Sequence, residues 1–284
     1  MANVEVVPLK KWSSFRRLAM GQWETAYDPS IYGSMDIRME QAEAYIKAFR
    51  EHTGKRITVT HLVTKAVAEA LRRCPEANAI LRFNSIYLRK TIDLSVLVVQ
   101  TDGGNDKVDL AACTIREVDK KSVYDLACEM EEQIARVRQR KDVAMEKGKK
   151  TAGLIPLIVM NAFLKLVAFL SYTLNLRLPG IPRDPFGGAT ITNVGSLGLD
   201  TAFVPLVPYT RVPIFLAVGE MATVPVVQDG AIVPGRTMKL CATLDHRIID
   251  GFHASVMSKV MHQYLEHPFD HFDKIETLPA AAAA

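Results

Sequence analysis

The clearest change of hydrophobic period in this chain lies near its C-terminus. Residues 238–244 alternate roughly as a half-buried strand does, and residues 252–265 carry apolar side chains at mostly helical spacing. His246 follows the strand, and Gly251, whose backbone can turn sharply, precedes the helix. The pattern therefore predicts a strand, a tight loop and a helix, with His246 at the strand end.

The same two periods predict further helices and strands. Apolar residues at helical spacing predict helices over 40–52, 61–73 and 122–139, with Thr60 as the N-cap of the second. Strand-like runs cover 34–39, 85–88, 94–100 and 214–218, and we expect 85–88 and 94–100 to share one sheet. The turn signal Gln228-Asp229-Gly230 predicts a hairpin before the strand that leads to His246.

Composition is that of an ordinary globular protein. The chain has 284 residues, 49% of them hydrophobic and 23% charged, which suits one large domain or two small ones. Its four cysteines lack the spacing of a zinc site or a disulfide framework, so we expect no metal and a reducing, cytoplasmic location. Residues 1–11 lack the apolar core of a signal peptide. The net charge of +4 suits an anionic ligand but is no nucleic-acid footprint.

A strongly apolar stretch runs from residue 152 to residue 176. A membrane span needs about 20 largely uninterrupted apolar residues, whereas Pro156, Asn161 and Lys165 interrupt this one. We favour burial against a neighbouring subunit or over the active site, with peripheral membrane contact through 152–176 as the alternative.

His246 is the candidate general base, because an imidazole is suited to take a proton near pH 7. Asp250 stands four residues later and could orient the histidine or anchor the loop. Position alone favours a buried histidine bonded to a backbone carbonyl. Further matches in the sequence favour catalysis.

These matches form a resemblance to a known family. His246-Arg247-Ile248-Ile249-Asp250-Gly251 resembles the H-R-x-x-D-G motif of the catalytic domain of 2-oxoacid dehydrogenase E2 acyltransferases. Residues 250–253, D-G-F-H, are similar to the same letters in chloramphenicol acetyltransferase, which shares that fold. Residues 190–198, T-I-T-N-V-G-S-L-G, are similar to the family's T-I-S-N-L-G segment, and residues 75–79 resemble its P-E-A-N-A. The three matches stand in the family's order.

The resemblance implies an α/β (α+β) fold, a chloramphenicol acetyltransferase-like two-layer sandwich with a mixed sheet and helices on one face. It implies a single catalytic domain over 1–279, with an apolar insertion at about 147–186 and an alanine tail at 280–284. No lipoyl or subunit-binding domain is expected in these residues. The insertion suggests an altered acceptor.

The implied activity is coenzyme A-dependent acyl transfer to a dihydrolipoyl thiol or a small molecule, by direct attack without an acyl-enzyme. His246 would be the base, Thr192 would replace the family's serine as the oxyanion donor, and Asp250 would hold the loop. Gly251 and Asn193 are supporting residues of the two motifs.

By the same resemblance, an arginine near the N-terminus pairs with the motif aspartate, which points to Arg16 or Arg17. The implied assembly is a homotrimer with active sites between subunits, extending to a larger cage. A lipoyl-bearing protein or other dehydrogenase-complex subunits are the implied partners, with any lipoyl group supplied by another chain. The alternative is a catalytically silent E2-like trimeric scaffold.

Overall fold

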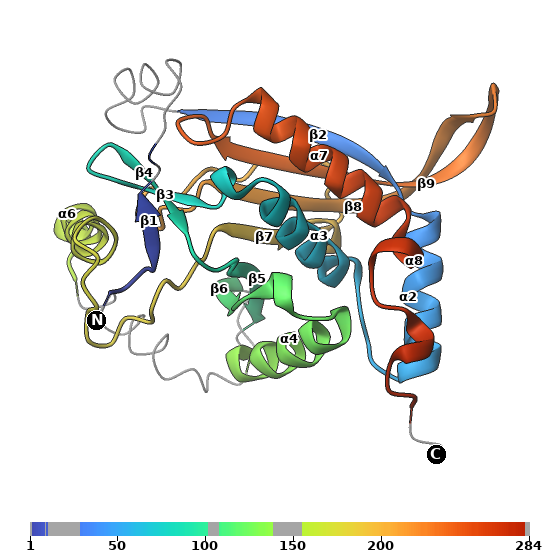
Figure 1. Cartoon of the computed structure of the whole chain (residues 1–284), viewed down its shortest axis with the longest axis horizontal. Coiled ribbons are helices and arrows are strands. Elements are labelled where there is room, and N and C mark those ends of the chain that lie inside the picture. The colour runs from blue at the N-terminus through green and yellow to red at the C-terminus, as the bar shows by residue number, and fades with distance from the viewer. Residues whose placement is uncertain (1, 9, 11–28, 102–107, 139–154, 282–284) are drawn as a thin grey trace.

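The computed structural model describes residues 2–8, 10, 29–101, 108–138 and 155–281 (Figure 1). Within these residues the strands form two sheets. The large sheet is mixed and has the order β2-β9-β8-β7-β5-β6, in which the pairs β5–β7 and β7–β8 are parallel. The small sheet is antiparallel and has the order β1-β4-β3. The strands are β1 Val6–Pro8, β2 Ser30–Arg38, β3 Ala79–Arg82, β4 Ser85–Arg89, β5 Leu94–Thr101, β6 Val108–Ile115, β7 Ala189–Asn193, β8 Ile214–Gln228 and β9 Ala231–Asp245.

Helices cover one face of the large sheet, which confirms the expected two-layer sandwich (Figure 1). Apolar side chains of the sheet, such as Ile191 and Leu240, share one core with Leu62 of α3 and Val260 of α7. This burial is the main stabilising contribution of the fold. The helices are α2 Glu40–Thr53, α3 Val59–Arg73, α4 Val123–Arg138, α6 Leu157–Ala168, α7 Gly251–Glu266 and α8 Pro268–His271, with short 3₁₀ turns at Pro75–Ala77, Val118–Lys120, Gly195–Leu197 and Ile275–Thr277.

The N-terminus of α3 differs from the prediction by two residues. The backbone N–H of Thr58 donates to Nδ1 of His61 at 3.1 Å, so Thr58 and not Thr60 caps the helix. The error arose because two threonines in T-V-T both satisfy the capping preference. Burial lowers the pKa of His61 to about 4, so this histidine is neutral near pH 7 and marks the helix start.

Two predicted strands lie in different sheets. We expected 85–88 and 94–100 to share one, but β4 pairs with β1 and β3 in the small sheet, and β5 pairs with β6 and β7 in the large one. The hydrophobic pattern of a strand indicates which of its faces is buried. It does not specify which other strand it pairs with.

The strand before His246 is one arm of a long hairpin. β8 and β9 pair from Ile214–Leu244 to Gln228–Ala231, and the turn at Asp229 and Gly230 uses positive φ values of 50° and 79°. The predicted turn is confirmed, while the separate strands expected around it belong to the two arms. The end of the hairpin projects beyond the rest of the molecule (Figure 1).

The apolar stretch forms α6 and a π-helical turn, Phe169–Thr173, beside the small sheet. Ala168 and Tyr172 pack against Val4 and Ile80. Within the chain Leu166 remains 55% exposed, and the expected contact of this stretch with a neighbouring subunit stays a prediction. Of the helices that the structure describes, none is both long and apolar enough to cross a bilayer.

Candidate active site

His246 begins the loop that joins β9 to α7. Its backbone N–H donates to the carbonyl of Pro29 at 2.8 Å, and the N–H of Asp245 donates to the carbonyl of Pro213 at 2.9 Å. Inside the loop, the N–H groups of Ile248 and Ile249 donate to the carbonyl of Asp245 at 3.0 and 2.9 Å. The backbone around His246 is therefore fixed on both sides and within the turn.

The loop also fixes the tautomer of the half-buried His246 ring. Nδ1 lies 2.9 Å from the carbonyl oxygen of Ile249. A carbonyl oxygen only accepts hydrogen bonds, so Nδ1 carries the hydrogen and the neutral ring has its lone pair on Nε2. This is the protonation pattern that a general base requires.

Arg247 and Asp245 form an ion pair beside the ring. Nε of Arg247 donates to Oδ1 of Asp245 at 2.9 Å, and a terminal nitrogen donates to Oδ2 at 2.6 Å. Both side chains are largely buried. The paired geometry holds the residue on each side of His246 in place.

Asp250 caps α7. Of the two roles that the sequence left open, orienting His246 or anchoring the loop, this position fits the second. Its carboxylate accepts the N–H of His253 at 3.1 Å and also contacts the ring of that residue. Nε2 of His253 lies 3.0 Å from a carboxylate oxygen of Glu76. The D-G-F-H and P-E-A-N-A segments are thus joined by Asp250, His253 and Glu76, a link that motif reading alone had missed.

Thr192 lies on β7, on the face of the sheet opposite the helices. Ile191 belongs to the core beneath the helices, so alternation along the strand turns Thr192 to the other side. Thr192 is in register with Ala217 of β8, which is in register with Cys241 of β9. His246 lies five residues beyond Cys241 and two strands away, a separation on the order of 20 Å. One chain therefore does not bring Thr192 and His246 together.

Asn193 and Gly195 shape the end of β7. The side chain of Asn193 donates to Oγ1 of Thr60 at 3.1 Å and accepts the N–H of Ser196 at 3.0 Å, which ties the strand to α3 and the following turn. A Cβ on Gly195 would lie 2.5 Å from the carbonyl oxygen of Gly219. Glycine is needed there because two backbone segments approach closely.

Gly251, the glycine of the His246 motif, differs from Gly195 in the space around it. Gly251 is the first residue of α7, its φ is not in the left-handed region, and no described atom lies within 4 Å of an added Cβ. The expectation that Gly251 provides a sharp turn was therefore wrong. The turn is made by the carbonyl of Asp245 and the cap of Asp250.

We expect Gly195→Ala to lower the free energy of unfolding by about 1–3 kcal/mol, the usual cost of forcing extra atoms into a filled space. Gly251→Ala, the matched control, should leave it unchanged or raise it by up to about 1 kcal/mol, because alanine restricts the unfolded chain. Urea unfolding of both purified variants measures the difference. Equal midpoints would contradict the close approach at Gly195.

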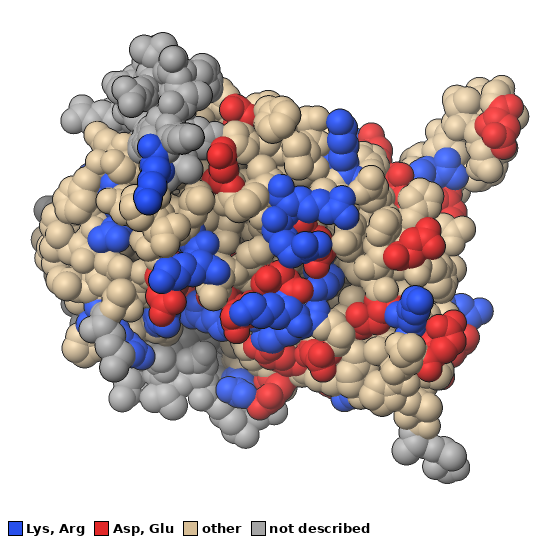
Figure 2. All heavy atoms as spheres, in the orientation of Figure 1, with Lys and Arg blue, Asp and Glu red and all other residues tan. Residues whose placement is uncertain are grey.

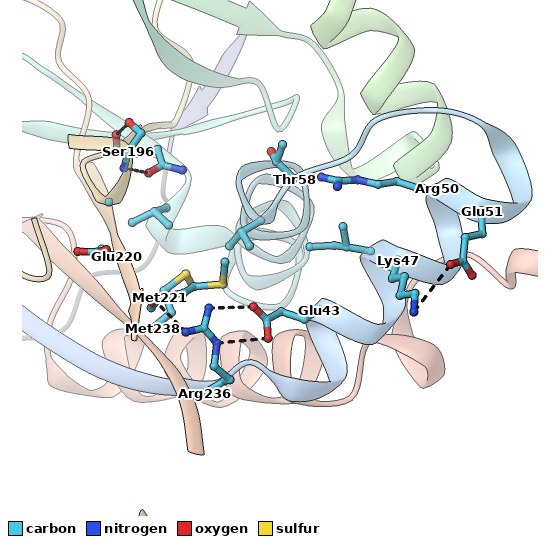
Figure 3. Close-up of a pocket in the computed structure, with 16 residues that line it drawn as sticks. Glu43, Lys47, Arg50, Glu51, Thr58, Ser196, Glu220, Met221, Arg236 and Met238 are labelled. Atoms are coloured by element: carbon cyan, nitrogen blue, oxygen red, sulfur yellow. Dashed lines mark hydrogen bonds and ion pairs between the residues drawn. The ribbon is translucent and has the colours of Figure 1, made fainter. Parts of the chain in front are cut away.

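A cavity of about 720 Å³ lies on the helix side of the same strand end (Figure 3). Its wall includes Asn193 and the ion pair between Arg236 and Glu43, at 3.1 Å. Thr192 does not line it. Arg16 and Arg17, the predicted partners of Asp250, lie outside the described residues.

The family model for 2-oxoacid dehydrogenases acyltransferase (catalytic domain) matches residues 4–151 and 185–272. The succinyltransferase component of the 2-oxoglutarate dehydrogenase complex from Staphylococcus epidermidis is 26% identical over 237 residues, which are 83% of this chain and 45% of that protein. This chain therefore spans less than half the length of that relative.

Solved structures share the fold. The dihydrolipoamide acetyltransferase of Azotobacter vinelandii, with a serine, a histidine and an asparagine studied for their role in its catalytic mechanism, superposes with a TM-score of 0.63 and 22% identity, covering 94% of this chain and 93% of that one. A chloramphenicol acetyltransferase superposes with a TM-score of 0.52 and 13% identity, over 92% of this chain and 99% of that one.

Proposed function

The chain belongs to the 2-oxoacid dehydrogenase acyltransferase family, through the catalytic domain, and on this basis we propose that it transfers an acyl group between coenzyme A and an acceptor. The acceptor is a dihydrolipoyl thiol or the nucleophile of a small molecule. One observation carries the proposal: the hydrogen bond from His246 to Ile249 leaves the lone pair on Nε2, where a base needs it.

In the proposed reaction, Nε2 of His246 removes the proton from the acceptor thiol, hydroxyl or amine. The acceptor then attacks the thioester carbonyl carbon of acyl-coenzyme A, and the π-electron pair of the C=O bond moves to the carbonyl oxygen. The resulting oxyanion accepts a hydrogen bond from the hydroxyl of Thr192. Collapse expels the thiolate of coenzyme A, which takes the proton back from Nε2.

We place the two halves of this site on neighbouring subunits of a homotrimer. The separation of Thr192 and His246 within one chain supports this, as does the position of Thr192 on the sheet face without helices. In the Azotobacter vinelandii enzyme the asparagine stands four residues after the histidine, as Asp250 stands four residues after His246 in this chain. Extension of the trimer to a larger cage is part of the same proposal.

We propose that a lipoyl group, where it is the acceptor, is presented by another chain of a dehydrogenase complex. The Staphylococcus epidermidis relative is a component of such a complex, and its name describes acyl transfer to a dihydrolipoyllysine residue. The catalytically silent scaffold is not favoured, because the relatives are named as acyltransferases.

The activity is tested by mixing the purified protein with a panel of acyl-coenzyme A donors and acceptors, free dihydrolipoamide included. We expect release of coenzyme A thiol with at least one donor and acceptor pair. Silence across the panel, together with no binding of coenzyme A, would instead support the scaffold.

The exposed side of α6 suggests a further contact. Val159, Ala162, Leu166 and Phe169 follow one another at steps of three and four residues, so they share one face of the helix, and all four are exposed. The surface over α6, at the left of Figure 2, is largely uncharged. From residue 147 to residue 183 the sequence has six lysines and arginines and no aspartate or glutamate.

We propose that this face of α6 lies on an anionic membrane surface, with the apolar strip inserting and the net positive charge of residues 147–183 favouring anionic lipid. The cytoplasmic location that we expect would present it to the inner leaflet. The alternative of a subunit contact gives no role to the excess of positive charge.

We expect the protein to co-sediment with vesicles that contain phosphatidylglycerol and not with pure phosphatidylcholine. Leu166→Glu should abolish binding, because it places a charge in the apolar strip. Ile232→Glu, at an exposed apolar residue on the distant hairpin, should leave it intact. If Leu166→Glu changes the subunit number and vesicles never bind, α6 is a subunit contact.

A further inference from the structure

A second, polar cavity lies where the His246 loop meets the tip of the β3–β4 hairpin. Its volume is about 200 Å³, and its lining includes Arg211, Arg247, Asn84 and Thr173. At about 30 Å³ per water molecule this is room for roughly six or seven waters. A carboxylate or phosphate group fits such a space, whereas a whole coenzyme does not.

Among the described residues, the charges around this cavity do not balance. Both oxygens of Asp245 accept hydrogen bonds from Arg247, at 2.9 and 2.6 Å. Arg211 faces the same pair, and the groups that act on it electrostatically are Arg247, Asp245 and Tyr172. Two guanidinium groups therefore share one carboxylate, and that carboxylate is already held by Arg247.

Arg211 is also incompletely bonded. Its Nε is buried and has no hydrogen-bond partner among the described residues. Burial lowers the pKa of Arg211, and the positive charge of Arg247 lowers it further. A buried donor without a partner destabilises the folded state, and more so when the group is charged.

The backbone at Arg211 adds an independent sign of constraint. Its φ of 56° lies in the left-handed region, which asparagine and glycine adopt more readily than arginine. Backbone strain of this kind is often found at functional sites, and Arg211 lines one cavity with Arg247, a second residue of the same charge.

We propose that the cavity between Arg211 and Arg247 binds an oxyanion, the carboxylate or phosphate group of a ligand. Guanidinium groups match such anions with paired hydrogen bonds. This inference rests on the proposed function in one respect: Arg247 directly follows His246, so the anion belongs to a substrate of acyl transfer. The source is either the distal carboxylate of a dicarboxylic acyl group or a phosphate of coenzyme A.

Binding is tested first without turnover. Inorganic phosphate and succinate are titrated by calorimetry into the full-length protein, into Arg211→Asn and into Arg136→Gln. Asparagine tolerates the left-handed backbone, so Arg211→Asn should fold. Arg136 is an exposed arginine of α4 paired with Glu132, and its variant is the matched control.

We expect at least one of the two anions to bind the native protein and Arg136→Gln alike, and to bind Arg211→Asn at least ten-fold more weakly. Arg211→Lys, which keeps the charge but loses the paired donors, should lie between them. Equal affinity in the native protein and Arg211→Asn, or no binding of either anion to the native protein, would overturn the proposal.

The source of the anion is separated by kinetics. If Arg211→Asn raises KM for succinyl-coenzyme A but not for acetyl-coenzyme A, the cavity takes the acyl carboxylate. If it raises both equally, the cavity takes a coenzyme phosphate. If no donor turns over, the proposed function fails, and calorimetry still decides whether the anion site exists.

Discussion

Replacing His246 by alanine is expected to lower the acyl-transfer rate by roughly 10²- to 10⁴-fold, the usual contribution of a positioned base. The acceptor would then have to lose its proton to water. The ring is half-buried and Nδ1 is bonded to the carbonyl of Ile249, so urea unfolding of the variant is measured beside the rate to separate a loss of stability from a loss of catalysis. Release of coenzyme A thiol, followed under saturating donor, measures the change.

His262→Ala is the matched control for this substitution. His262 is a half-exposed histidine of α7 that pairs with Glu266 at 3.1 Å, away from the loop. Its removal should leave the rate unchanged. Full acyl-transfer activity in His246→Ala would show that the imidazole is not the base.

Thr192→Val is expected to lower the rate by roughly 10²- to 10³-fold, because valine keeps the branched shape of threonine and removes the hydroxyl donor. Thr192→Ser should retain most of the activity. The more informative result comes from combining Thr192→Val with His246→Ala on separate chains.

If the proposed homotrimer forms, an assembly that contains both variants has one interface in three that joins a native His246 from one chain to a native Thr192 from the next. Each variant is given a different affinity tag, and mixed assemblies are purified through both tags. These assemblies should therefore recover about a third of the native activity. Activity that stays at the level of the single variants would contradict a site shared between subunits.

The sequence predicted most strongly the elements whose signals are local. The strand before His246, the helix after it and the turn at residues 228–230 were each confirmed. Their hydrophobic periods and turn residues depend only on neighbours in the chain. The fold class was also predicted correctly, through three motifs that stand in the family's order.

Predictions that depended on distant residues were less successful. The separation of β4 from β5 into two sheets has no local signature, because the sequence of a strand does not specify which strand it pairs with. We expected Gly251 to provide a sharp turn, which the start of α7 does not require. Arg211 was not singled out at all, since its significance lies in the approach of Arg247 from another part of the chain.

The sequence by itself determined the candidate groups for chemistry and the order in which they stand: an imidazole at a strand end, a hydroxyl on an earlier strand and a carboxylate that begins a helix. These follow from local pattern and motif. Only the tertiary structure decided how the groups are placed: the carbonyl of Ile249 selects the tautomer of His246, and strand register separates Thr192 from His246. Strand pairing and loop closure bring together residues that are far apart along the chain, so no local pattern contains these distances.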